Sequence, residues 1–132
     1  MFKLKKEVLK DSTNVPVGTK YLLEGEIGYG TEVNELQKLK EEFDNLTELV
    51  LSDAVIIDVT NLVYWDSLAL RSIFPQIIEV NRNSNKRGTL PVSFIGSTET
   101  DVYDAARERF IESGSDIIPW YPSVPQYLQA HH

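Results

Sequence analysis

The sequence predicts an α/β fold of about five strands and about four helices in the order ββαβαβαβα. Two observations lead to this prediction: two strand-like segments near the N-terminus are joined by turn residues, and strands then alternate with helices to the end of the chain. Such alternation implies a sheet covered by helices, with right-handed crossovers between the strands. At 132 residues, without an internal repeat or linker, the chain is expected to form one domain.

The N-terminal part is expected to form a hairpin of two strands, over residues 2–9 and 20–27, with turn residues at 11–14 and Pro16. Lysines in the first strand are typical of an edge strand, because charge there discourages pairing with another sheet. A helix then follows between residues 32 and 50. Its apolar residues fall on one stripe, and Glu32 and Glu35 lie near its positive N-terminal end.

The same periodicity predicts three strands and three helices in the rest of the chain. The strands are 54–59, 90–95 and 116–118, and the helices begin at Ser67, after Thr98 and at Ser123. Gly114 ends the helix that follows Thr98, since glycine readily adopts the left-handed conformation of a C-cap. Pro75 interrupts the helix that begins at Ser67, so this helix either bends near residues 70–71 or starts again at Pro75.

Composition argues against several classes of function. Twenty acidic against thirteen basic residues give a formal charge of −7, which disfavours nucleic acid or anionic lipid as the main partner. The absence of cysteine excludes disulfides, thiolate metal sites and a cysteine nucleophile. No apolar stretch approaches the roughly twenty residues of a membrane-spanning helix. The first residues also lack the features of a signal peptide, so we expect a cytoplasmic protein.

The residue types that common catalytic sites need are missing as well. The only histidines, His131 and His132, end the chain, and we interpret them as the remnant of a tag. No histidine is then left for a Ser-His-Asp site or for a zinc cluster. Asp58 and Asp66 could in principle share a proton, but Asp58 falls within a strand and no substrate cleft is indicated. We therefore expect a protein without catalysis, metal or cofactor.

One junction combines spacing, residue type and expected geometry in a way that points to a function. Asp66 is a good N-cap candidate after a core strand, and Ser67 would be the first helical residue. One interpretation is that both residues only cap the helix. The other is that Ser67 accepts a phosphate, which adds about −1.5 to −2 charge. The helix N-terminus would tolerate this anion, so its effect would fall on a docking partner.

The run from Val55 to Ala69, VIIDVTNLVYWDSLA, resembles the signature of STAS domains, the family of anti-sigma factor antagonists and stressosome proteins. In that family a hydrophobic strand ends in Asp-x-Ser/Thr, and Asp-Ser or Asp-Thr follows a few residues later at a helix start. The segments 94–96 and 112–118 also resemble the family's later strand, helix and turn. The resemblance implies one STAS-like domain over residues 1–130, with a mixed sheet of about five strands backed by about four helices.

The resemblance also implies a role in protein binding without catalysis, and phosphorylation of Ser67 by a partner kinase. The common pattern in the antagonists is Asp-Ser-Ser/Thr-Gly, whereas this chain has Leu68 and Ala69 after the acceptor. This departure fits a scaffold-type member better than an ordinary antagonist. The expected partners are an anti-sigma factor, a serine kinase or further copies of this chain. An oligomerising scaffold without a phosphate switch, and a small-ligand-binding domain, remain alternative hypotheses.

A docking surface is expected where the carboxyl ends of the strands meet at one edge of the sheet, the edge at which α/β proteins usually bind. Aromatic residues are frequent at binding hot spots, and several follow the predicted strands. The alternative for each aromatic residue is that it packs against the helices. The expected partner-binding residues are Tyr29, Trp65, Asp66, Ser67, Leu68, Ser97, Thr98 and Trp120.

Overall fold

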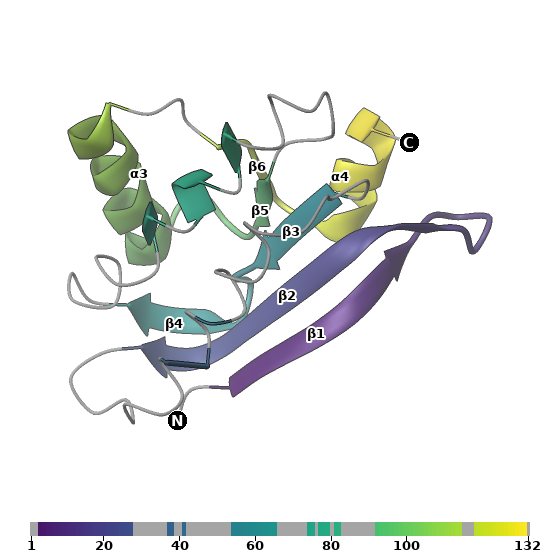
Figure 1. Ribbon diagram of the computed structural model, residues 1–132, viewed down its shortest axis with the longest axis horizontal. Helices are drawn as coiled ribbons and strands as arrows, with labels where there is room; N and C mark the ends of the chain where they lie inside the picture. Colours follow the sequence, from purple (N-terminus) through teal and green to yellow (C-terminus); the bar gives the residue numbers. More distant parts are fainter. Residues whose placement is uncertain are drawn as a thin grey trace.

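Six strands form one sheet with helices on both of its faces in a computed structural model of the chain (Figure 1). The structure describes residues 3–27, 37–38, 41, 54–65, 74–75, 77–79, 81–82, 92–114 and 118–131. The strands are β1 (Lys3–Lys10), β2 (Pro16–Ile27), β3 (Ala54–Asp58), β4 (Leu62–Trp65), β5 (Ser93–Ile95) and β6 (Trp120–Tyr121). Two helices have defined bounds, α3 (Asp101–Ser113) and α4 (Val124–His131).

The sheet has the strand order β1-β2-β3-β5-β6, and β4 pairs with β2 beyond the end of β3. Only the β1–β2 pairing is antiparallel; the other described pairings are parallel. This arrangement confirms the mixed α/β fold and the position of the lysine-bearing strand at an edge. Residues 37–38 and 41, and residues 74–75, 77–79 and 81–82, are helical, which agrees with the two helices expected there.

The side chain of Asp11 stabilises the turn between β1 and β2. Its Oδ1 accepts hydrogen bonds from the backbone N–H of Thr13 at 2.9 Å and of Val15 at 3.0 Å. Asn14 adopts the left-handed conformation with φ 64°, which asparagine tolerates better than most residues. The turn residues that the sequence indicated therefore close the hairpin, and β2 begins earlier than expected, at Pro16.

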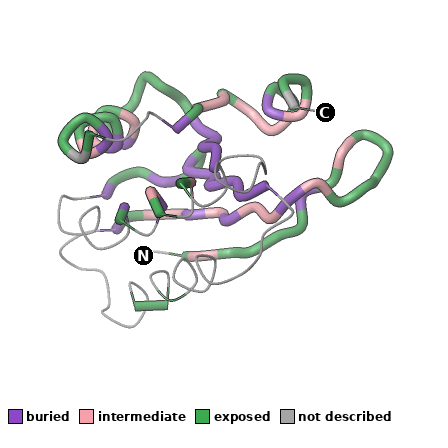
Figure 2. The backbone as a smooth tube through the Cα atoms, turned by 45° about the horizontal axis from the view of Figure 1, so that its top comes forward, coloured by how far each residue is buried: buried purple, intermediate pink, exposed green. Residues whose placement is uncertain are grey.

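The centre of the sheet is β3, whose five residues are all buried. A parallel strand covered on both faces needs such a continuous apolar run. Gly18 of β2 lies against β3 so closely that an added Cβ atom would stand 2.5 Å from the carbonyl oxygen of Ala54. Figure 2 shows that the centre of the sheet is buried, whereas the edge strand β1 is mostly exposed.

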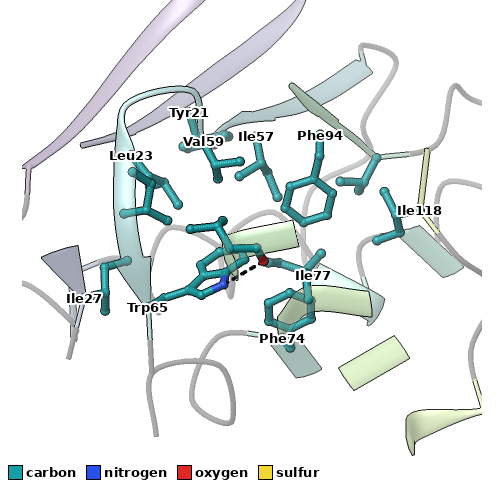
Figure 3. Packing of buried hydrophobic residues seen from close by; sticks show 14 of the residues in the cluster. Tyr21, Leu23, Ile27, Ile57, Val59, Trp65, Phe74, Ile77, Phe94 and Ile118 are labelled. Carbon is teal, nitrogen blue, oxygen red and sulfur yellow. Dashed lines mark hydrogen bonds between the residues drawn. The ribbon is translucent and has the colours of Figure 1, made fainter. Parts of the chain in front are cut away.

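Two hydrophobic clusters lie on opposite faces of the sheet, because alternate residues of a strand point in opposite directions. The larger cluster, part of which Figure 3 shows, joins Ile57 and Phe94 to residues of α3 such as Phe110. The smaller cluster joins Ile56 to Tyr127 of α4. Helices α3 and α4 therefore cover different faces. Within the smaller cluster, the pKa of Tyr127 is raised to about 12, first by its burial and second by the nearby Tyr121.

Three strand predictions need correction. The last strand is Trp120–Tyr121, and Ile118, which we expected in a strand, is a buried residue outside it. The pairing with β5 sets the position of this strand, since Trp120 pairs with Phe94 and Tyr121 with Ile95. The strand expected over 90–95 is shorter, with Val92 described outside it. The sequence reading also missed β4, which lies between the strand expected over 54–59 and the helix expected from Ser67.

The boundaries of α3 follow its capping residues. At its start, the Oγ1 of Thr100 accepts a hydrogen bond from the backbone N–H of Tyr103 at 3.2 Å. At its end, Gly114 has φ 67°, and its N–H donates to the carbonyls of Ile111 and Phe110. The predicted C-cap glycine is therefore confirmed.

Candidate functional site

The carboxyl ends of the parallel strands meet at one edge of the sheet, as the sequence predicted. Backbone hydrogen bonds tie their ends together: Val59 N–H donates to the Ile95 carbonyl at 2.8 Å, and Gly96 N–H donates to the Tyr121 carbonyl at 3.0 Å. The segments that follow β3, β5 and β6 therefore lie at a common edge, which we call the carboxyl edge.

The turn between β3 and β4 is organised by Asp58. Its Oδ1 accepts a hydrogen bond from the backbone N–H of Thr60 at 2.9 Å, and Leu62 N–H donates to the Val59 carbonyl at 3.1 Å. This local bond explains physically why an Asp-x-Thr sequence ends the strand: the carboxylate turns the backbone two residues on. The Asp58 carboxylate therefore has a structural task in this turn.

Asp58 is also the buried end of a short chain of charges across the sheet. Lys20 Nζ lies 3.9 Å from Asp58 Oδ2 and 3.5 Å from Glu7 Oε2. The Asp58 side chain is 9% exposed and that of Glu7 52%. A charge at so buried a position needs a partner, and Lys20 supplies it. These contacts connect the edge strand β1, through β2, to the turn that follows β3.

Trp65 fixes the end of β4 in the core. It is 3% exposed, its Nε1–H donates to the carbonyl oxygen of Val102 at 3.0 Å, and its ring meets that of Phe74 edge-on at 5.5 Å. Figure 3 shows this bond as a dashed line between the indole and the first turn of α3. For Trp65 the structure supports the packing alternative over direct contact with a partner. Its position matters because Asp66 and Ser67 come next in the sequence.

Ser97 and Thr98 lie at the carboxyl edge and are exposed. The Oγ of Ser97 accepts a hydrogen bond from Glu99 N–H at 3.1 Å, and the Ser97 carbonyl accepts one from the hydroxyl of Thr100 at 3.2 Å. Ser97 therefore helps to form the turn that leads into α3. Thr98 stands beside it on the surface.

Trp120 is half-buried and belongs mainly to the packing of the sheet. Its ring stacks on Phe94 with 4.7 Å between the centroids and meets Tyr103 edge-on at 5.0 Å. The other expected partner-binding residues, Tyr29, Asp66, Ser67 and Leu68, lie outside the described residues.

Two exposed apolar residues at this edge were missed in the sequence reading. Val63 is 71% exposed and Tyr64 49%, and both belong to β4 directly before Trp65. The signal for them was a run of β-branched and aromatic residues, which is typical of a strand. Exposed aromatic residues in a strand beside a predicted acceptor are candidates for partner contact.

Within the described ranges, no group of three or more histidine, cysteine, aspartate or glutamate residues is placed to hold a metal ion. None of the helices in this part of the chain has the length and apolar character needed to cross a membrane.

No family model matches the sequence, and neither does any curated protein. Comparison with solved structures finds an uncharacterised protein of the DUF3478 family with a SpoIIAA-like fold, from Shewanella loihica. It has a TM-score of 0.62 and 11% identity, covering 98% of this chain and 94% of that one. The anti-sigma factor antagonist SpoIIAA in its unphosphorylated form has a TM-score of 0.58 and 10% identity, with 98% and 96% covered.

A sulfate transporter family protein from Wolinella succinogenes is also similar, with a TM-score of 0.54, 12% identity, and 92% of each chain covered. The three similar proteins carry different descriptions, and a fold by itself does not determine function. What the similarities share is the architecture. The chain therefore has the SpoIIAA-like fold, which is the fold that the resemblance to STAS domains predicted.

Proposed function

We propose that this chain is a non-catalytic regulatory domain of the cytoplasm that binds a protein partner at the carboxyl edge and is switched by phosphorylation of Ser67. The observation that carries the proposal is the anchoring of Trp65. The residue two positions before Ser67 is buried and hydrogen-bonded to the first turn of α3. Trp65 therefore fixes the chain two residues before the proposed acceptor.

The chemistry of the surrounding surface supports partner binding more than catalysis. Val63 and Tyr64 offer apolar contact beside the anchor, and Thr98 offers a hydroxyl near the start of α3. We include these with Tyr29, Asp66, Ser67, Leu68 and Ser97 in the proposed partner surface, which Trp65 and Trp120 support from beneath. A phosphate in such a surface adds charge that a docked partner would have to desolvate.

The similarity to SpoIIAA suggests the class of partner. That protein is described as an anti-sigma factor antagonist, and its structure is of the unphosphorylated form. We propose by analogy that this chain binds an anti-sigma factor or a serine kinase of that type, and that the kinase transfers phosphate to the Ser67 hydroxyl. The analogy is one of fold, so the experiment must test the site itself.

The direct test is intact-mass analysis of the protein purified from its native cell, with peptide mapping of any phosphate. We expect one phosphate in the wild-type protein and none in Ser67→Ala. Ser123→Ala is a matched control, because Ser123 also starts a helix and its Oγ accepts a hydrogen bond from Gln126 N–H at 3.4 Å. Phosphate that persists in Ser67→Ala, or is lost equally in Ser123→Ala, would contradict the proposal.

The switch is tested by affinity capture of the partner. Ser67→Ala should bind like the unphosphorylated protein, whereas Ser67→Asp should bind at least about tenfold more weakly, because an uncompensated charge in an interface costs more than about 1.4 kcal/mol. Ser12→Asp should leave binding unchanged, because Ser12 is exposed in the turn between β1 and β2, at the amino end of β2. Equal binding by wild type, both Ser67 variants and the phosphorylated protein would leave no switch at this position.

A further inference from the structure

Strand β1 is a long, regular edge that no strand of the described sheet covers on its outer side (Figure 1). It pairs with β2 in continuous register from Lys3 to Leu9, and a register shift occurs only before Lys10. Proteins usually protect an edge with a short strand, a bulge, proline or a covering segment. Here the protection along most of the strand is its charge.

That charge is opposite in sign to the rest of the molecule. The sequence of β1, KLKKEVLK, carries a formal charge of +3, whereas the whole chain carries −7. Lys3, Lys5 and Lys10 are exposed, and their partners across the strand pair are Glu24, Leu22 and Pro16. The strip is therefore a local basic region on an acidic protein.

The two sides of β1 differ in what they offer. Lys3, Lys5 and Glu7 point to one side of the sheet by strand alternation, and Glu7 is already engaged by Lys20 at 3.5 Å. This leaves Lys3 and Lys5 as the positive charges of β1 itself on that side, with Glu24 of β2 directly across from Lys3. On the other side, Val8 is 61% exposed and offers apolar contact.

The charges of β1 determine which kind of segment can pair with this edge. A second copy of β1 would set lysine against lysine, which is destabilising across a strand pair. An acidic segment is opposite in net charge to β1 and gains from Lys3 and Lys5, with the charge of Glu7 offset by Lys20, while backbone groups of an edge strand accept an added strand. We propose that β1 is a docking edge for an extended acidic segment of a partner protein, one with carboxylates at alternate positions that meet Lys3 and Lys5.

This edge is separate from the carboxyl edge and from Ser67, so the proposal goes beyond the function proposed above and does not depend on it. Its failure would leave the phosphorylation test unaffected. The pairing also differs from electrostatic attraction alone, because an added strand requires hydrogen bonds from its own backbone. The experiment can therefore separate a docked strand from a bound polyanion.

The probe is a capped, fluorescein-labelled peptide of eight residues in which glutamate alternates with threonine, measured by fluorescence anisotropy at low ionic strength. We expect saturable binding, with amide chemical-shift changes confined mainly to β1 and its neighbour β2. Lys3→Glu/Lys5→Glu should weaken binding by roughly tenfold, since two weak exposed attractions become weak repulsions. Lys38→Glu is the matched control, because Lys38 is exposed and lies outside β1.

Four further measurements decide the outcome. The Lys3→Gln/Lys5→Gln variant should weaken binding by a smaller factor, and unchanged thermal unfolding of both double variants would confirm that they fold. Two further peptides are methylated at alternate backbone nitrogens, one at the odd and the other at the even positions. One of them should lose binding, because it lacks the N–H groups that would donate to β1. The proposal is overturned if Lys38→Glu weakens binding as much as the β1 double variant, if both methylated peptides bind normally, or if duplex DNA or phosphatidylserine vesicles bind β1 more tightly than the peptide does.

Discussion

Strands β3 and β1 belong to one sheet, yet they are built from opposite kinds of residue. All five residues of β3 are buried, whereas Leu9 is the single buried residue among the eight of β1. The difference follows from position: β3 has strands on both sides and packed clusters on both faces, and β1 has a strand partner on one side only. Burial therefore shapes the sequence of a strand in this protein more than the strand conformation itself does.

The sharpest way to test this contrast is to truncate one side chain in each strand. Ile57→Ala in β3 should lower the free energy of unfolding by about 2–5 kcal/mol, because Ile57 is fully buried and its loss leaves a cavity. Val8→Ala in β1 should change it by less than about 0.5 kcal/mol, because Val8 is 61% exposed. Equilibrium urea unfolding measures both. Equal losses would show that β1 is covered in solution.

A second test compares the two ends of the charge chain through Lys20. Asp58→Ala should cost about 1–3 kcal/mol, because it removes the acceptor of the Thr60 N–H and the partner of a half-buried lysine. Glu7→Ala should cost at most about 0.5 kcal/mol, since exposed ion pairs contribute little. Raising the salt concentration should reduce the Glu7 effect further. An Asp58 effect no larger than that of Glu7 would mean that the turn holds without its carboxylate.

Trp65→Phe extends the comparison to β4, the continuation of β3 along β2. Phenylalanine keeps most of the packing against Phe74 but lacks the N–H that donates to the Val102 carbonyl. We expect a loss of about 1 kcal/mol in unfolding free energy, because the carbonyl of Val102 also lies within a helix. Hydrogen exchange should show faster opening near the start of α3. No change in either measurement would remove Trp65 as the anchor of the proposed site.

The smallest effect on stability is expected from neutralising β1. Replacing Lys3, Lys5 and Lys10 by serine should alter the free energy of unfolding by less than about 0.5 kcal/mol, because all three are exposed. The same change should promote self-association in light scattering, since the charges that discourage edge-to-edge pairing are gone. A protein that stays monomeric at all concentrations would show that the lysines do not protect this edge.

Much of the fold could be predicted from the chain because its signals are local. The apolar run of β3, the hairpin turn at Asp11 and the C-cap at Gly114 each depend on a few adjacent residues. The last strand could not be placed in this way. Ile117 and Ile118 look more strand-like than Pro119 and Trp120, but pairing with Phe94 and Ile95 selects Trp120 and Tyr121.

The candidate site was predicted less completely, for the same reason. The clustering of strand ends followed from the alternation of strands and helices, but the burial of individual residues did not. Trp65 and Tyr64 are adjacent aromatic residues, and only the fold shows that the first is in the core and the second is on the surface. The predicted acceptor, Ser67, stays a prediction from the sequence and its resemblance.

The turn at Asp11 also has a consequence for the order in which the sheet assembles. Strands β1 and β2 meet across a turn of five residues, and hairpins of this kind form within about 1–10 μs. Pairing of Gly18 with Ala54 must wait until a much longer segment has closed, which slows it. During synthesis the hairpin also leaves the ribosome before β3 does. We therefore expect the strand with the least burial to help start the sheet onto which the most buried strand later adds.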